Sequence, residues 1–452
     1  MRLQLKTSNK IRLSILSILA VGGASLGIFT STLQVHALGT ERYVATTGTD
    51  IGNCSVLANP CATVQYAVTN AVAGDIVNVA AGTYTESIIV NKALTLKGAQ
   101  ADVDARTRGA VSETIIEVPD NGALNPFAIR ATSSDVTVNG FTITTESPTD
   151  ASHGVEVSPG GAANLNVLNN IIKDHGWGLF AYAVTDINGL RVSKNLFTNN
   201  DRSDTSTDMY LTGSVGTDIE ISDNVIKDSD NGVSAPKAAI NLGADTGQTL
   251  TNVRILRNTV SNTGTFLVLH STDGATIQDN VASSGSRTGL ALNLKLDNIT
   301  IKNNKLTDFN YGMEFATNFP IGGAPATNVS VTDNTITNSQ QAGVVIRANA
   351  IASGIVFSNN TFTGNPVGIQ NESSVAVAAN DNWWGCDAGP GQPGCDTFSG
   401  NVTVTSWLRQ GVIPGVPNTS TALLSTPPLI ASGVVALLIL AGGSYAVRKT
   451  RS

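Results

Sequence analysis

Apolar and polar residues alternate in a short phrase that recurs along the middle of the chain. In one copy, residues 299–308 (ITIKNNKLTD), the apolar Ile299 and Ile301 lie two positions apart. Asn304 follows three positions later, and the apolar Leu306 comes two positions after it. Alternation with a period of two predicts a half-buried β-strand, and asparagine tolerates a left-handed bend in which its amide can hydrogen-bond its own backbone. The phrase therefore predicts two short strands joined by a bend at the asparagine.

The asparagine of this phrase recurs nine times in one register. The copies place it at Asn170, Asn195, Asn224, Asn258, Asn280, Asn304, Asn334, Asn360 and Asn380. A glycine followed by an apolar residue often comes a few positions later, which predicts a second turn and a third strand. These glycines are Gly178, Gly232, Gly289, Gly312, Gly343 and Gly368.

Three short strands and three turns in each repeat predict one coil of a parallel β-helix. This fold is an all-β solenoid in which each coil rises by about 4.8 Å. Stacked coil on coil, the asparagines can form a ladder of amide-to-amide hydrogen bonds. A β-sandwich is the alternative fold, but it gives no reason for one asparagine register to recur nine times.

Both ends of the chain differ from the middle. Residues 1–37 carry basic residues and then an apolar run with a small-x-small pattern, which predicts a signal peptide; an uncleaved anchor is the alternative. Residues 429–447 are uncharged and precede the basic residues 448–452, which predicts a transmembrane helix with a cytoplasmic tail rather than a buried core helix. The proline-rich residues 411–428 predict a linker or stalk. We therefore expect an exported protein, anchored in the cell membrane by a single C-terminal helix, with a β-helix domain at residues 38–410 outside the cell.

Charge narrows the choice of partners. The two end segments hold seven of the 27 basic residues and none of the 34 acidic ones, so the part between them has 20 basic residues and a net charge of −14. An acidic surface argues against nucleic acid as a partner. It also disfavours long anionic polysaccharides unless a metal ion bridges the like charges.

The four cysteines form two local pairs. Cys54 lies close to Cys61, and Cys386 lies close to Cys395. In an exported chain such pairs predict two disulfides. Zinc is the alternative, but it prefers tighter cysteine spacing and clustered histidines.

The chain resembles the right-handed parallel β-helix repeat proteins of the pectin-lyase-like superfamily. The repeats carry this likeness over residues 136–384, and residues 43–100 are similar to the N-terminal segment of many exported members. In residues 62–72 a helical face is expected to bury Val64, Val68, Ala71 and Val72, and this helix would cap the open end of the solenoid. Residues 382–396 (NWWGCDAGPGQPGCD) look like the family's C-terminal closure, in which Trp383 and Trp384 would plug the last coil.

The catalytic phrases of the superfamily are missing. The chain has no Asn-Thr-Asp phrase or Gly-His-Gly of the polygalacturonase type, and no Arg-x-Pro-x-x-Arg phrase of the pectate-lyase type. Candidate residues come instead from neighbouring turns: His153, Asp174 and His175 could supply a general base beside an acid, and Trp177 could stack on a sugar. The alternative is that these are ordinary turn residues.

One acidic loop could bind calcium. Asp201, Asp204 and Asp208 lie near Asp228 and Asp230 of the following coil and could supply oxygen ligands. The loop lacks the glycine-punctuated spacing of an EF-hand, so a solvated loop is the alternative. No other cofactor is expected.

The sequence favours a displayed surface protein over an enzyme. The missing catalytic phrases favour adhesion, glycan binding or a structural role at the cell surface. The alternative is a carbohydrate-active enzyme, either a polysaccharide lyase or a glycoside hydrolase, that acts in a groove along one sheet.

Overall fold

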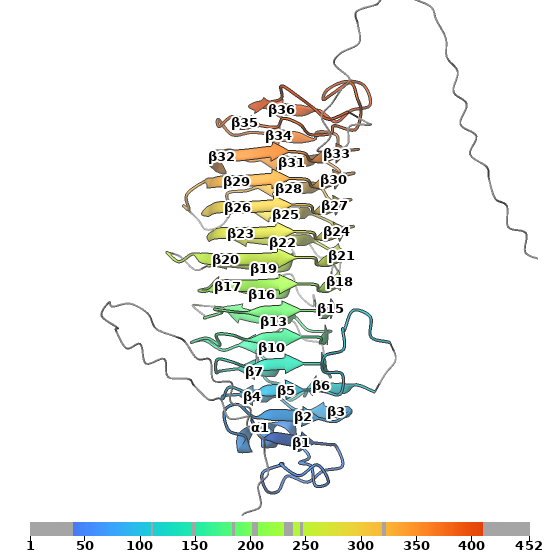
Figure 1. The fold of residues 1–452 in the computed structure, drawn as a ribbon, viewed down its shortest axis with the longest axis vertical. Helices are drawn as coiled ribbons and strands as arrows, with labels where there is room; N and C mark the ends of the chain where they lie inside the picture. The colour runs from blue at the N-terminus through green and yellow to red at the C-terminus, as the bar shows by residue number, and fades with distance from the viewer. Residues whose placement is uncertain are drawn as a thin grey trace, which may run out of the picture.

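The strands stack into three long parallel sheets that wind round one axis (Figure 1). The computed structural model describes residues 39–109, 112–146, 151–182, 186–200, 207–229, 238–244, 247–318 and 322–409. Each complete coil contributes one strand to each sheet in the same order, and the coils at the two ends contribute fewer, so strands that are distant in sequence become neighbours. The prediction of an all-β parallel solenoid is confirmed.

The three sheets differ in length. Sheet A has 14 strands: β1 (Glu41–Val44), β2 (Ile76–Val79), β5 (Thr95–Lys97), β8 (Thr137–Asn139), β11 (Asn166–Leu168), β14 (Arg191–Ser193), β17 (Thr217–Ser222), β20 (Leu250–Leu256), β23 (Thr272–Gln278), β26 (Leu296–Lys302), β29 (Ala326–Thr332), β32 (Ile351–Ser358), β35 (Val377–Ala378) and β37 (Val402–Thr403). Sheet B has 11 strands: β3 (Gly82–Thr85), β6 (Thr114–Val118), β9 (Thr142–Thr145), β12 (Ile171–Lys173), β15 (Leu196–Thr198), β18 (Val225–Ser229), β21 (Thr259–Thr263), β24 (Val281–Ser283), β27 (Lys305–Thr307), β30 (Thr335–Thr337) and β33 (Thr361–Thr363). Sheet C has 12 strands: β4 (Ile88–Val90), β7 (Phe127–Ala131), β10 (His153–Val157), β13 (Trp177–Tyr182), β16 (Thr207–Ser214), β19 (Ala238–Ala244), β22 (Thr265–His270), β25 (Thr288–Leu292), β28 (Tyr311–Phe315), β31 (Ala342–Ile346), β34 (Ile369–Asn371) and β36 (Phe398–Gly400).

The interior is filled by the inward-facing apolar residues of all three sheets. Ile277, Ile301 and Val331 are partners on neighbouring strands of sheet A, and all three are fully buried. Leu306 on sheet B and Met313 on sheet C close the same core from the other two sides. Burial of apolar surface contributes about 25 cal/mol per Å², so a continuous column of such residues stabilises every coil against its neighbours.

A ladder of buried asparagines runs between sheets A and B. Asn258 is typical: its backbone N–H and its Nδ2 donate to Oδ1 of Asn280 at 2.9 and 3.0 Å, and Nδ2 also donates to the carbonyl of Ile221 at 2.9 Å. Eight of the predicted asparagines take part and are at most 1% exposed: Asn170, Asn195, Asn224, Asn258, Asn280, Asn304, Asn334 and Asn360.

Asn380 is not part of the ladder, and the prediction for this residue is wrong. The pairing of β35 with β32 places Asn382 beside Asn360, whose backbone N–H donates to Oδ1 of Asn382 at 2.8 Å. The run VAVAA at residues 375–379 alternates equally well after a shift of two residues, so its pattern could not fix the register. Asn380 instead accepts hydrogen bonds from the backbone N–H and the hydroxyl of Thr405.

The left-handed bend lies one residue earlier than expected. The residues before three ladder asparagines, Asp223, Arg257 and Asp279, have φ angles of 56°, 53° and 57°. This residue turns the chain, and the asparagine after it then points into the interior. The ladder amides therefore bond chiefly to neighbouring coils rather than to their own backbone.

Helix α1 (Val64–Asn70) lies at the N-terminal end beside β1 and is shorter than the predicted residues 62–72 (Figure 1). The hydroxyl of Thr63 accepts a hydrogen bond from the first turn, as N-caps do. The buried face consists of Val64, Ala67 and Val68. The chain is extended at Ala71, so Val72 leaves the predicted apolar face and is 60% exposed, which makes the prediction for Val72 wrong.

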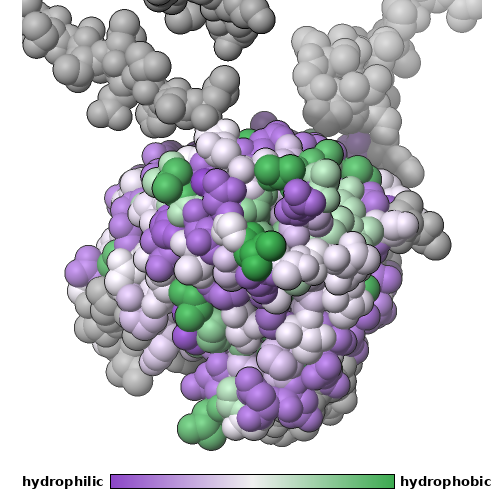
Figure 2. Space-filling view, turned by 90° about the horizontal axis from the view of Figure 1, so that it is seen from below, coloured by the Kyte–Doolittle hydropathy of each residue, from purple (hydrophilic) through white to green (hydrophobic). Residues whose placement is uncertain are grey.

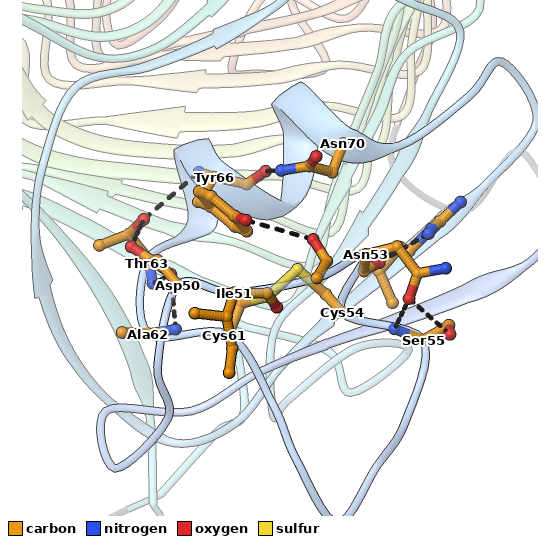
Figure 3. Close-up of a disulfide and its surroundings, with 12 residues drawn as sticks. Asp50, Ile51, Asn53, Cys54, Ser55, Cys61, Ala62, Thr63, Tyr66 and Asn70 are labelled. Atoms are coloured by element: carbon orange, nitrogen blue, oxygen red, sulfur yellow. Dashed lines mark hydrogen bonds between the residues drawn. A yellow bond between two sulfur atoms is a disulfide. The ribbon is translucent and has the colours of Figure 1, made fainter.

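Both predicted disulfides are confirmed, Cys54–Cys61 and Cys386–Cys395. The first lies under α1, where Asp50 accepts hydrogen bonds from the backbone of Ala62 and Thr63 (Figure 3). The Cys54–Cys61 disulfide therefore ties the loop before α1 to the start of the helix. Seen from the N-terminal end, the surface is mainly polar with small separate apolar patches (Figure 2).

At the other end, Trp384 is fully buried and contacts Phe362, with ring centroids 5.2 Å apart, as the predicted closure requires. Trp383 is only half-buried, so one tryptophan rather than two fills the last coil.

The predicted signal peptide (residues 1–37), linker (411–428), membrane span (429–447) and tail (448–452) all lie outside the described residues. In the part of the chain that the structure describes, no helix has the length and apolar character to cross a bilayer.

Candidate functional site

Two rows of outward-facing side chains run across the N-terminal half of sheet C. In the first row Arg130, Glu156, Phe180 and Tyr210 are partners on four successive strands, β7 to β16. In the second row Phe127, His153, Trp177 and Thr207 are partners in the same way. The first row alternates with buried apolar residues such as Val155 and Val157, whereas two buried residues, such as Ala128 and Ile129, separate the second row from the first on each strand.

The two rows form a cavity of about 350 Å³ that we call the aromatic cleft. Its lining consists of Asn125, Arg130, His153, Glu156, Trp177, Phe180, Tyr182 and Tyr210. Phe180 stacks on His153, with ring centroids 4.1 Å apart at 16°, and on Tyr210 at 5.7 Å and 12°. Trp177 meets His153 edge-on at 5.3 Å. The cleft therefore presents several fixed aromatic surfaces at one place.

A charged group lies at the bottom of this aromatic layer. Glu156 is 7% exposed and forms an ion pair with Arg130 at 2.9 Å and a hydrogen bond with Nδ1 of His153 at 2.9 Å. Burial raises the pKa of Glu156, but the hydrogen bonds from His153 and Arg130 outweigh it and hold the pKa below its usual value. The Arg130 guanidinium also lies over the Phe127 ring, 3.7 Å from its centroid. Glu156 is therefore an ionised carboxylate at neutral pH.

Trp177 has an unused hydrogen-bond donor. Its indole nitrogen, Nε1, is buried and has no hydrogen-bond partner among the described residues. A buried donor without a partner carries a desolvation cost of about 1–3 kcal/mol. A ligand hydroxyl that accepts from this N–H would remove that cost.

The predicted site residues separate into two groups. His153 and Trp177 lie on adjacent strands at the same level, as the repeat register predicted, and both line the cleft. Asp174 and His175 do not join them. Asp174 takes the left-handed position after β12, with a φ of 67°, and accepts from Nδ2 of Asn199 at 2.6 Å. His175 turns inward and is fully buried, with its backbone N–H donating to Oδ1 of Asn200.

Of the three aspartates proposed as calcium ligands, Asp208 alone lies within the described residues. Asp201 and Asp204 lie outside the described residues. Asp208 is fully buried and accepts from Nδ2 of Asn200 at 3.0 Å and from the Ser229 hydroxyl at 2.9 Å. Within the described ranges no group of three or more His, Cys, Asp or Glu side chains could hold a metal ion.

Several cleft residues were missed by the sequence reasoning, among them Arg130, Glu156, Phe180, Tyr182 and Tyr210. Each occupies an outward position, or continues an outward row, in a strand whose alternation is visible in the sequence. Aligning the strands of sheet C in the way that the asparagines were aligned would have placed Glu156, Phe180 and Tyr210 side by side.

Comparisons with known proteins agree with the fold. The family model described as "Right handed beta helix region" matches residues 238–383, which is less than half of the chain. A comparison with the curated proteins finds no match. The solenoid is therefore a right-handed parallel β-helix, as the resemblance implied.

Three solved structures are similar. A GH136 lacto-N-biosidase from Eubacterium ramulus has a TM-score of 0.50 at 11% identity, over 81% of this chain and 67% of that chain. The catalytic unit of a GH87 α-1,3-glucanase from Streptomyces thermodiastaticus has a TM-score of 0.49 at 17% identity, over 76% and 66%. An alginate lyase from Paenibacillus has a TM-score of 0.43 at 13% identity, over 80% and 99%. At these identities the likeness concerns the fold alone.

Proposed function

We propose that this chain is a carbohydrate-active protein that binds a polysaccharide at the aromatic cleft of sheet C. The observation that carries the proposal is the stack of His153, Phe180 and Tyr210 beside Trp177 in one cavity. Aromatic faces are partly negative, and the C–H groups on a pyranose face are partly positive, so the two surfaces attract while both lose water. The free indole N–H of Trp177 adds a polar contact for a sugar hydroxyl.

Of the two functions that the sequence left open, action on carbohydrates is better supported than surface adhesion. The lacto-N-biosidase with the same fold is named for an activity on a sugar, which agrees with the ligand class that the cleft favours. Adhesion has no comparable support. The cleft contains an ionised carboxylate beside a histidine, which is more than a purely adhesive surface needs.

Glu156 is the residue we propose for the chemistry. As an ionised carboxylate it can hold His153 in one orientation through Nδ1, and His153 can then act as a base, or Glu156 can stabilise positive charge that develops on the sugar. Hydrolysis by the usual route needs a second carboxyl group about 5–9.5 Å away. Among the described residues that line the cleft, Glu156 is the one carboxylate. This observation favours a second candidate function, in which the cleft binds the polysaccharide without cleaving it.

One experiment separates these functions. The purified protein is incubated with a panel of neutral and acidic polysaccharides, and binding is measured beside the release of reducing or unsaturated ends. An enzyme releases ends, and Glu156→Gln stops the release while binding persists. Binding without release supports the second candidate. Binding that is absent for every polysaccharide, or unchanged in Trp177→Ala, contradicts the proposal.

We also propose that the protein is exported and anchored by residues 429–447, and that α1 covers the open N-terminal end of the solenoid. The support is the charge and hydropathy pattern of the two chain ends and the buried face of α1. Removal of residues 429–452 is expected to release the protein from the membrane fraction of the producing cell. Retention in that fraction would overturn the anchor.

A further inference from the structure

The floor of sheet C continues beyond the aromatic cleft. Tyr210, the last residue of the cleft, is the partner of Asn241 on β19. The same outward row then passes through Val268, Ala291 and Glu314 on β22, β25 and β28. The aromatic cleft therefore leads into a second stretch of groove without leaving the sheet.

A second cavity, of about 310 Å³, lies over this stretch, and we call it the amide pocket. Its lining includes Asn241, Arg287, Asn293, Asn310, Tyr311 and Glu314. Asn241 lines the amide pocket and its partner Tyr210 lines the cleft, so the two cavities are one strand apart. They are neighbouring parts of one groove.

Two amide oxygens in the pocket have no partner. Asn293 is 2% exposed, and its Oδ1 has no hydrogen-bond partner among the described residues. Oδ1 of Asn241 is also buried and unpartnered within the same described residues. More than nine in ten buried polar groups are hydrogen-bonded, and an exception costs about 1–3 kcal/mol, so two exceptions in one cavity need an explanation. Two acceptors that await donors suit the hydroxyl groups of a sugar.

Each carboxylate that lines the two cavities is paired with an arginine, and Arg287 of the amide pocket is the one further charged side chain among their described lining residues. Glu156 pairs with Arg130 in the cleft, and Glu314 pairs with Arg347 at 2.8 Å beside the pocket. Between these pairs the row consists of Phe180, Tyr210, Asn241, Val268 and Ala291, none of which is charged. A polyuronate would bring one negative charge with each residue and would meet no matching row of cations, in a chain that is already acidic.

We propose that the amide pocket is a second sugar-binding subsite and that the ligand is a linear, uncharged polysaccharide that spans both cavities. This inference rests on the proposed function and adds the length and the charge class of the ligand. From β7 to β28 there are seven strand steps, which at about 4.8 Å each give a groove of about 34 Å. The aromatic end holds sugar faces, and the amide end accepts hydrogen bonds from hydroxyls.

The test is a length series measured by calorimetry. Linear neutral gluco- and xylo-oligosaccharides from disaccharide to decasaccharide are titrated into the full chain, beside oligogalacturonates of the same lengths. The affinity for one neutral series is expected to rise with length until both cavities are filled. The double variant Asn241→Leu/Asn293→Leu is expected to weaken the longest members about tenfold and to leave the shortest unchanged. Oligogalacturonates are expected to bind at least about tenfold more weakly than the neutral series.

Matched controls keep the outcome clear. Asn166→Leu removes an outward asparagine from sheet A and is expected to change no affinity. If the double variant does not fold, the single variant Asn241→Ala, at a half-buried position, is measured in its place. Binding of short oligosaccharides with no gain from length, a gain that survives the substitutions, or equal binding of oligogalacturonates would overturn this inference and leave the proposed function standing. Failure of every probe to bind would overturn both.

Discussion

Buried asparagines lie in two regions of this molecule, the ladder and the groove, and differ in whether their side chains are hydrogen-bonded. In the ladder, the Asn258 amide donates to two coils, and its oxygen accepts both the backbone N–H and the Nδ2 of Asn224, each at 3.0 Å. In the groove, Asn293 is almost equally buried, yet its oxygen has no partner in the described part of the chain. The same side chain is therefore structural in one place and available in the other. The state of its hydrogen bonds, rather than burial or residue type, separates scaffold from candidate site.

The largest difference is expected when each kind of asparagine is removed. Asn258→Ala leaves the Ile221 carbonyl and the N–H groups of Asn224 unpaired in the interior, so the free energy of unfolding should fall by about 3–5 kcal/mol. Denaturant titration of the variant beside the wild type measures the loss. A loss below about 1 kcal/mol would mean that the ladder is not what holds the coils together at this turn.

A smaller effect, on binding rather than folding, is expected at the aromatic end. Trp177→Ala removes a half-buried ring that lies beside the His153 and Phe180 rings, so it should weaken polysaccharide binding by about 1–2 kcal/mol, roughly five- to thirtyfold. Trp383→Ala, half-buried near the last coil, is the matched control and should leave affinity unchanged. Equal effects of the two substitutions on binding would show that Trp177 acts through general stability.

The groove asparagine should respond in the opposite direction to the ladder. Asn293→Leu replaces an amide whose buried oxygen has no partner among the described residues by an apolar side chain of similar size, so the free energy of unfolding is expected to rise by about 1 kcal/mol. The titration used for Asn258→Ala provides the measurement. A marked loss of stability would reveal that the Asn293 amide is structural and would remove the contrast with the ladder.

The smallest expected effect is a difference between the aromatic cleft and the ladder in how the free energy of unfolding depends on pH. The pKa of Glu156 is lower in the folded protein than its ordinary value of 4.5, so the stability it contributes is present above about pH 4.5 and is lost as the pH falls through the folded value. Asparagine does not titrate, so the contribution of Asn258 should not change with pH. The stability gap between wild type and Glu156→Gln should therefore narrow below about pH 4.5, whereas the gap to Asn258→Ala stays constant. A Glu156→Gln gap that is independent of pH would contradict the assignment of an ionised Glu156.

The interior could be predicted from the sequence because each coil repeats one local pattern. Ile301 marks the inward face of a strand, and Asn304, three residues later, marks the ladder position. The same pattern recurs in the neighbouring coils. The prediction failed at Asn380, where small residues alternate at two registers, and at Val72, where the helix ends two residues early. At Asn380 the deciding contact, between Asn382 and Asn360, lies between two coils.

The site was less predictable because its residues gather across coils. His153 and Trp177 were found, since both stand next to a repeated glycine. Asp174 and His175 were assigned to the site because they are close to Trp177 in sequence, but the turn sends one to the surface and the other into the core. Glu156 escaped attention because two of its neighbours, Arg130 and Phe180, come from other strands.

Because the coils stack at a fixed spacing, their number determines the length of the groove. Within the three sheets each coil pairs with the coil before it and the coil after it, so a whole coil can be removed while the ladder closes again behind it. Every coil taken from the stretch between β16 and β28 would shorten the groove by one strand spacing, about 4.8 Å, and would leave the aromatic cleft intact. The number of coils therefore sets the length of polysaccharide that fits into the groove.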